Sequence, residues 1–108
     1  MRIDLMQLQF VDPKLRHIAI EAERHFGVEL TITSLYRIDD GGVHGTLPLR
    51  GLDVRCHDRT VGGAVEDYAN TMWVYDPGRP HLRVCQAHDS GMGFHLHFQV
   101  HPKTIRRL

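Results

Sequence analysis

One segment of this 108-residue chain, residues 93–100 with the sequence GFHLHFQV, restricts the possible folds more than any other. In an extended strand successive side chains point to opposite faces. The apolar residues of the segment therefore share one face, and His95, His97 and Gln99 share the other. A core behind the apolar face would hold the two imidazoles rigidly, as a zinc site requires of its ligands. For an isolated His-x-His pair the alternative is a half-buried strand whose polar residues face water.

The length and charge of the chain limit the class of protein. A chain of 108 residues is long enough for one domain, residues 1–108, with a core of its own. Lysine plus arginine and aspartate plus glutamate each number 13, so no overall basic field attracts nucleic acid or an anionic membrane. No apolar run approaches the roughly 20 residues that cross a bilayer, and residues 1–10 lack the pattern of an export signal. These features predict a cytoplasmic protein with neither nucleic-acid nor membrane partners.

Cysteine and histidine usage bears on the chemistry. Cys56 and Cys85 have neither CxxC spacing nor the density of a disulfide scaffold, which favours reduced, buried and unreactive thiols. One disulfide between them is the alternative. The chain also contains nine histidines, and histidine is the commonest metal ligand.

The local patterns predict two helices and four strands. Asp12-Pro13 is typical of an N-cap followed by proline at the first helical position, and Gly27 ends the apolar periodicity that follows. A second helix is expected over residues 60–72, with Thr60 as its cap. Strands are expected over residues 28–35, 49–56, 81–86 and 93–100, and loops over residues 38–45 and 87–92. This order predicts an α+β fold: a central antiparallel β-sheet with helices on one side and a site on the other.

Three segments offer metal ligands: His44 in a loop, Asp53 on a strand, and the pair His95 and His97. Two histidines and one carboxylate with an open fourth position form a catalytic zinc site, because a structural zinc normally has four protein ligands. Zinc lowers the pKa of a bound water toward roughly 7 and polarises a carbonyl under attack. The sequence therefore suggests zinc-dependent hydrolysis.

Four places in the chain carry a resemblance to a known family: SLYR at residues 34–37, His44, GLD at residues 51–53 and HLH at residues 95–97. They resemble the zinc D-Ala-D-Ala carboxypeptidases and L-alanyl-D-glutamate endolysins of the LAS group, which is named for lysostaphin, D-Ala-D-Ala metallopeptidases and Sonic hedgehog. The resemblance covers about two-thirds of the chain. It implies a Hedgehog-like α+β fold in a small, phage-encoded hydrolase that cleaves peptidoglycan bonds next to D-amino acids.

The resemblance also implies a role for individual residues. One zinc ion would be bound by His44, Asp53 and His97, with zinc-bound water as the nucleophile. Arg37 would bind or polarise the scissile carbonyl. His95 would stabilise the transition state or transfer a proton. The expected partner is the peptide of peptidoglycan.

Two features depart from the family pattern. Asp53 follows His44 by nine positions instead of the usual seven, an expansion that a loop absorbs easily. Many members have a carboxylate three residues before the last ligand as general base, and that residue here is Phe94. His95 is therefore the favoured proton-transfer group, with Asp89 as the alternative base.

Three further polar residues bear on the expected site: His88, Gln99 and Glu66. His88 and Gln99 are candidates to hydrogen-bond a zinc ligand or a substrate carboxylate. For His88 an ordinary loop histidine is an equal alternative. Glu66, on the second helix, is expected to face solvent.

Each assigned site residue also has an ordinary interpretation. His44 is alternatively a loop histidine. Asp53 is alternatively a solvated residue or the partner of Arg50 or Arg55 in a surface pair of little energetic value. Arg37 is alternatively the partner of a neighbouring aspartate.

Two other functions compete with the peptidase. A non-catalytic, metal-stabilised binding or virion module would keep the same fold and ligands without a general base. A small cupin-like barrel also places His-x-His on a strand, but the two expected helices and the lack of a downstream cupin glutamate disfavour it.

Overall fold

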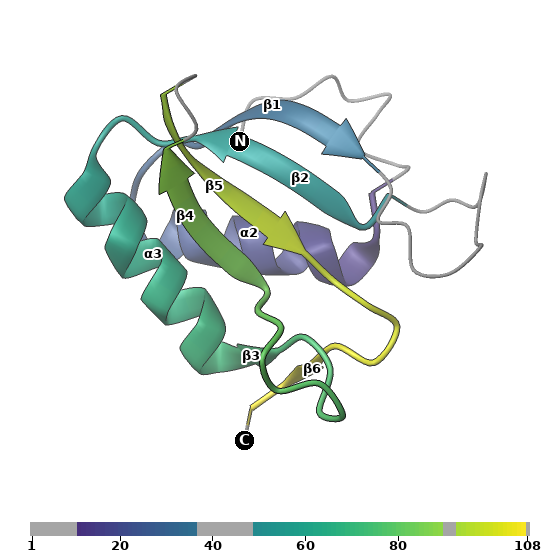
Figure 1. The fold of residues 1–108 in the computed structure, drawn as a ribbon. Helices are drawn as coiled ribbons and strands as arrows, with labels where there is room; N and C mark the ends of the chain where they lie inside the picture. Colours follow the sequence, from purple (N-terminus) through teal and green to yellow (C-terminus); the bar gives the residue numbers. More distant parts are fainter. Residues whose placement is uncertain (1–10, 37–48, 90–92, 108) are drawn as a thin grey trace.

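Two helices and six strands make up the described part of the chain (Figure 1). The computed structural model describes residues 11–36, 49–89 and 93–107. In chain order the elements are α2 (Pro13–Phe26), β1 (Thr31–Tyr36), β2 (Gly51–Arg55), α3 (Arg59–Met72), β3 (Trp73–Val74), β4 (Cys85–Asp89), β5 (Phe94–Gln99) and β6 (Ile105–Arg106). Strands β1-β2-β5-β4 form an antiparallel sheet in that order, and β3 pairs with β6 separately. The predicted α+β class is confirmed.

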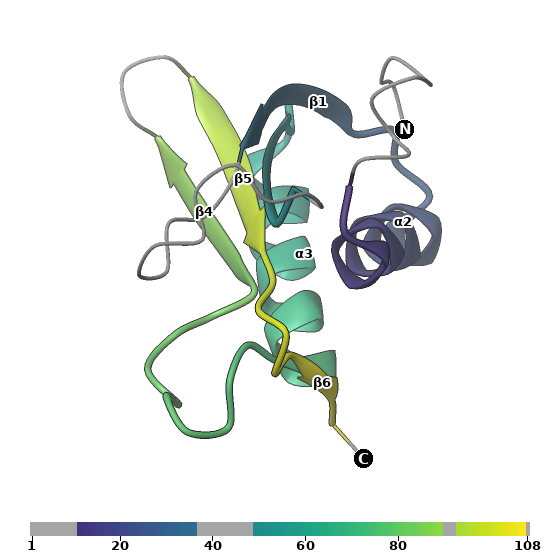
Figure 2. The same cartoon turned by 90° about the vertical axis from the view of Figure 1, so that its right-hand side faces the viewer.

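Helices α2 and α3 lie on the same side of the four-stranded sheet (Figure 2). The sheet residues on that side are buried: Leu52 and Val54 of β2 stand opposite Phe98 and Leu96 of β5. The helices contribute six residues to the same core cluster: Leu15, Ile18, Ala19, Ala22, Val65 and Ala69. Because strand side chains alternate, the polar residues of β2 and β5 occupy the opposite face of the sheet.

The ends of α2 agree with the sequence prediction. The Asp12 carboxylate accepts a hydrogen bond of 2.8 Å from the backbone N–H of Lys14, and Pro13 opens the helix. Gly27 follows the last turn with φ 64°, the left-handed conformation that glycine adopts without steric cost.

The start of α3 differs from the prediction. The helix begins at Arg59 and its N-cap is Asp58, so the expectation that Thr60 is the cap is wrong. The Asp58 carboxylate accepts from the backbone N–H groups of Thr60 and Val61 at 2.8 and 3.2 Å. A carboxylate at this place also interacts favourably with the helix dipole, so it is a better cap than a threonine two residues later.

Strand β4 lies later in the sequence than expected. It covers Cys85–Asp89, whereas the predicted strand covered residues 81–86 and the predicted loop residues 87–92. Its register is set by the hairpin with β5, in which Cys85 stands opposite Phe98 and Asp89 opposite Phe94. The position of β4 therefore depends on its partner strand, which local sequence patterns do not report.

Side chains from α3 bind the outer edge of β4. Asn70 donates through Nδ2 to the carbonyl of Cys85 (2.8 Å) and accepts through Oδ1 from the backbone N–H groups of Val84 and Cys85 (3.1 and 3.2 Å). Oε2 of Glu66 accepts from the backbone N–H of Ala87 at 2.6 Å. The expectation that Glu66 faces solvent is wrong, because its carboxylate satisfies a backbone donor that an edge strand otherwise presents to water or to another chain.

Two expectations from composition can be compared with the structure. Cys56 and Cys85 are both buried and free of disulfides, as predicted. Burial raises the pKa of the Cys85 thiol, which keeps this cysteine protonated. Within the described ranges, no helix combines the length and apolar character needed to cross a membrane.

Candidate metal centre

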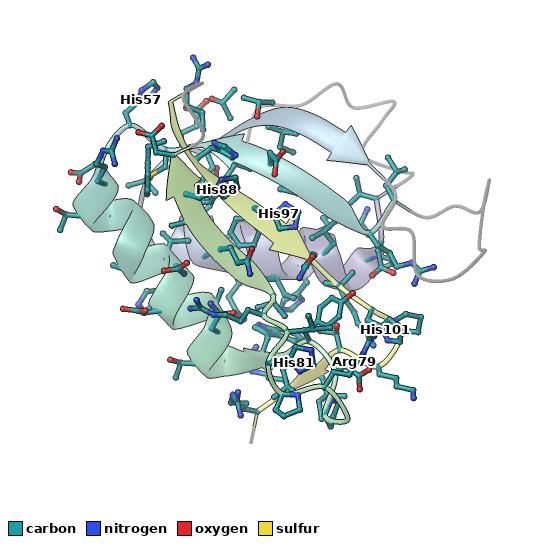
Figure 3. All side chains as sticks on the ribbon, in the orientation of Figure 1. His57, Arg79, His81, His88, His97 and His101 are labelled. Atoms are coloured by element: carbon teal, nitrogen blue, oxygen red, sulfur yellow. The ribbon has the colours of Figure 1, made fainter. Side chains whose placement is uncertain are left out.

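Asp53 and His97 meet on the open face of the sheet. They are directly opposite each other in the β2–β5 ladder, and Nδ1 of His97 lies 3.0 Å from Oδ1 of Asp53. Their side chains are only 20% and 25% exposed for His97 and Asp53 respectively. Figure 3 shows His97 and His88 on the face of the sheet that points away from α2. The pairing of β2 with β5 thus joins two of the three ligands expected from the sequence.

Gln99 holds the imidazole of His97 from the other side. The amide Nε2 of Gln99 donates to the carbonyl of Arg83 at 2.8 Å, so its oxygen faces His97. That oxygen lies 3.1 Å from Nε2 of His97. Since an amide oxygen only accepts, this contact is a hydrogen bond when Nε2 of His97 carries a proton.

The hydrogen bond to Gln99 determines the chemistry of the other imidazole nitrogen. A neutral imidazole that is protonated at Nε2 has a lone pair at Nδ1, and this nitrogen faces the Asp53 carboxylate. Two acceptor atoms 3.0 Å apart repel each other unless a proton or a cation lies between them. The pair therefore suits either an imidazolium–carboxylate ion pair or a shared metal ion.

The distance between the two acceptor atoms fits a shared zinc ion. Zinc binds histidine nitrogen at about 2.0–2.1 Å and carboxylate oxygen at about 2.0–2.2 Å, so two such ligands in tetrahedral geometry lie about 3.4 Å apart. The observed separation of 3.0 Å requires only a small opening of the pair. A hydrogen bond from the remote imidazole nitrogen, here to Gln99, is also the usual support of a metal-bound histidine.

Burial raises the pKa of Asp53 above that of a free aspartate, and the nearby imidazoles of His95 and His88 lower it by a smaller amount. A cation beside Asp53 would favour the charged form of its carboxylate. Asp53 also lies next to a register shift between Ile32 and Ser34 of β1. Such bulges are common beside functional sites.

His95 and His88 form a second imidazole pair on the same face. They stand opposite each other in the β4–β5 hairpin, with ring centroids 4.0 Å apart. Nδ1 of His95 lies 3.2 Å from the carbonyl of Gly93, so this nitrogen carries the proton in the hydrogen bond. A neutral His95 therefore has its lone pair at Nε2, the atom that a proton-transfer group needs.

Asp89, the alternative base, is not brought to the Asp53–His97 pair. In the alternation of β4 it shares the face of Cys85 and Ala87, which is the helix side of the sheet. Its carboxylate forms an ion pair with Arg59 at the start of α3. The structure thus associates Asp89 with the helix layer.

Two expected site residues, His44 and Arg37, lie outside the described residues. Among the residues that the structure describes, no three histidine, cysteine, aspartate or glutamate side chains form a group that could hold a metal ion. Of the three expected ligands, the structure therefore describes only Asp53 and His97.

Sequence reasoning identified Gln99 as a candidate partner of a ligand because it shares the face of His97, and the structure confirms the contact. It did not identify the carbonyl of Arg83, which orients Gln99, or the hydroxyl of Thr33, which donates to the carbonyl of Asp53 at 3.3 Å. Both contacts join residues at least 16 positions apart in the chain, and no local pattern signals them. Comparisons of the chain with models of protein families, with curated proteins and with solved structures find no match.

Proposed function

We propose that this protein is a zinc-dependent peptidase of the LAS type that hydrolyses peptide bonds next to D-amino acids in peptidoglycan. The observation that carries the proposal is the 3.0 Å contact between Nδ1 of His97 and Oδ1 of Asp53. Both residues are at the positions that the resemblance to the LAS family assigns to zinc ligands. The third ligand in this proposal is His44, which lies outside the described residues.

The surrounding residues have separate tasks in the proposed reaction. When bound, zinc would act as a Lewis acid that polarises the scissile carbonyl and lowers the pKa of a bound water toward about 7. Gln99 keeps the proton of His97 on Nε2, so that the lone pair of Nδ1 stays directed at the proposed position of the metal. His95, whose Nδ1 is hydrogen-bonded to the carbonyl of Gly93, accepts or returns a proton through Nε2. Arg37, outside the described residues, is assigned to the scissile carbonyl.

The proposal is tested by measuring metal content and hydrolysis in one preparation. We expect elemental analysis to find about one zinc per chain, and chromatography of treated peptidoglycan to show fragments cut beside D-amino acids. Chelation should abolish the hydrolysis, and added zinc should restore it, because a three-ligand site releases and rebinds its metal. A protein that neither contains nor binds zinc would contradict the proposal, as would hydrolysis that continues in the presence of chelator.

The support that Gln99 provides to His97 leads to a separate prediction. In Gln99→Leu the imidazole loses the acceptor at Nε2, so we expect the affinity for zinc to fall by about 10- to 100-fold. Gln86→Leu is the matched control, because Gln86 also stands opposite His97, on β4, but is exposed and bonds to neither ligand. Competition with a chromogenic chelator measures both affinities. Equal affinities for zinc in the two variants would show that Gln99 does not support zinc binding by His97.

A non-catalytic, metal-stabilised binding or virion module is the second candidate. It is favoured by the ion pair between Asp89 and Arg59, and by the apolar Phe94 at the place where related enzymes have a carboxylate. This candidate predicts the same zinc content without any hydrolysis of peptidoglycan. Metal analysis and the hydrolysis assay together therefore separate the two functions.

A further inference from the structure

A row of three polar side chains crosses the open face of the sheet beside the Asp53–His97 pair. Arg55 of β2 stands directly opposite His95 of β5, and His95 stands opposite His88 of β4. Arg55 follows Asp53 by two residues on the same strand, so the two side chains share a face and their Cα atoms are about 7 Å apart. The row is therefore adjacent to the proposed position of the metal.

The charge of Arg55 is not used within the described part of the chain. Its side chain is exposed and has no carboxylate partner among the described residues. The surface pair with Asp53 that the sequence allowed is not formed, because the Asp53 carboxylate contacts His97. Four other arginines do pair with carboxylates: Arg59, Arg79, Arg83 and Arg106. The guanidinium of Arg55 thus keeps its planar set of N–H donors, which fits a carboxylate, for a group from outside.

His95 is restrained on the side that faces β4. The ring of His88 packs against it edge to face, with centroids 4.0 Å apart, and its Nδ1 is hydrogen-bonded to the carbonyl of Gly93. On the side that faces β2 its neighbour is Arg55, and residues that stand opposite each other in a sheet have Cβ atoms about 4.5–5.5 Å apart. We therefore expect a group that receives a proton from Nε2 of His95 to lie toward β2, beside Arg55.

In the proposed hydrolysis the group that receives this proton is the nitrogen of the leaving residue. The oxygen of water bonds to the scissile carbonyl carbon, the carbon–nitrogen bond breaks, and the nitrogen leaves with the proton that Nε2 of His95 took from the water. If the leaving residue is the last one of the peptide, its free carboxylate carbon is only two bonds from this nitrogen. An internal residue has a neutral amide at the same place, which leaves the charge of Arg55 unused.

We propose that Arg55 binds the free C-terminal carboxylate of the substrate, so that the protein is a carboxypeptidase that releases a single D-amino acid and not an endopeptidase. The inference rests on the proposed peptidase function and names its substrate class. It depends on the position of an exposed guanidinium without a carboxylate partner, directly opposite the proposed proton-transfer residue His95.

The test compares a peptide acid with its amide. The substrate is an acetylated tripeptide that ends in two D-alanines, and its C-terminal amide has the same size without the charge. We expect the wild type to hydrolyse the acid with a kcat/KM about tenfold or more above that of the amide. In Arg55→Gln the kcat/KM of the acid should fall to that of the amide. Arg24→Gln removes an exposed charge from α2, on the other side of the sheet (Figure 2), and should keep the preference.

Binding is measured separately from hydrolysis. Asp53→Asn should lack zinc and cleave neither peptide, so titration followed by nuclear magnetic resonance reports the binding of both. The acid should bind about tenfold more tightly than the amide, and the added substitution Arg55→Gln should make the two affinities equal. Circular dichroism checks that each variant is folded, as expected for changes at partly or fully exposed positions.

The outcomes separate this inference from the proposed function. Equal kcat/KM values for acid and amide in the wild type, or a preference that persists in Arg55→Gln, would overturn the role of Arg55 while the peptidase stands. If the wild type cleaves neither peptide, the peptidase proposal fails and the binding titration decides about Arg55. Equal affinities would then overturn the carboxylate site, and a preference for the acid that is lost with Arg55 would support it.

Discussion

Asp53→Asn and His97→Ala are each expected to reduce the zinc content of the purified protein from about one ion per chain to nearly none. Asparagine keeps the size of the aspartate but removes its charge, and alanine removes Nδ1 of the imidazole. Either change leaves the proposed centre with two protein ligands, too few for a stable zinc site. Elemental analysis after dialysis measures the loss, and hydrolysis of peptidoglycan should fall to the level of the chelated wild type.

The controls for this prediction are a histidine and an aspartate away from the centre. His81 lies in the segment between β3 and β4, far from His97 on the sheet (Figure 3), and Asp67 is an exposed residue of α3. His81→Ala and Asp67→Asn should keep their zinc. Circular dichroism should show that all four variants are folded. If both site variants also kept their zinc, the contact between Asp53 and His97 would be an ordinary ion pair and the peptidase proposal would fail.

Asn70→Ala is expected to lower the free energy of unfolding by about 3 kcal/mol or more, the largest stability effect that we predict. The substitution leaves the N–H groups of Val84 and Cys85 and the carbonyl of Cys85 without the side chain that binds them. Val84 and Cys85 are fully buried, and each buried polar group that loses its partner costs about 1–3 kcal/mol. Since small domains are stable by only about 5–15 kcal/mol, such a loss is a large fraction of the total.

Urea denaturation followed by circular dichroism measures this change. Thr71→Ala, at the next and exposed position of α3, is the matched control and should lie within about 0.5 kcal/mol of the wild type. Asn70→Asp keeps an acceptor for the two N–H groups but loses the donor to Cys85, so its stability should fall between the other two. A loss below about 1 kcal/mol in Asn70→Ala would mean that water or a shift of β4 replaces these bonds.

The parts of the fold that were predicted correctly depend on neighbours in the sequence. Asp12, Pro13 and Gly27 mark the ends of α2 because caps and left-handed glycine act within one helical turn. The alternation in β5 gave the correct buried face, with Leu96 and Phe98 in the core. The bounds of β4 were wrong because the hairpin with β5 and the side chains of α3 select them.

The candidate site, too, has one part that could be predicted from the sequence and one part that depends on strand pairing. The types of Asp53 and His97 and their order in the chain were sufficient for the resemblance to the LAS family to suggest both residues as zinc ligands. Their separation of 44 positions along the chain gives no indication that they lie 3.0 Å apart. That distance requires β2 to pair with β5 in one particular register, and a shift of a single residue would place Asp53 opposite a core residue.

The sequence by itself determined which side chains share a face, because side-chain direction along a helix or strand follows from local backbone geometry. It therefore placed His95, His97 and Gln99 together, opposite the core. The tertiary structure alone decided which faces meet. Strand pairing and helix packing are selected by the free energy of the whole core, which depends on contacts between residues distant in the chain. The Asp53–His97 contact, the role of Glu66 and the ion pair of Asp89 with Arg59 all follow from that selection.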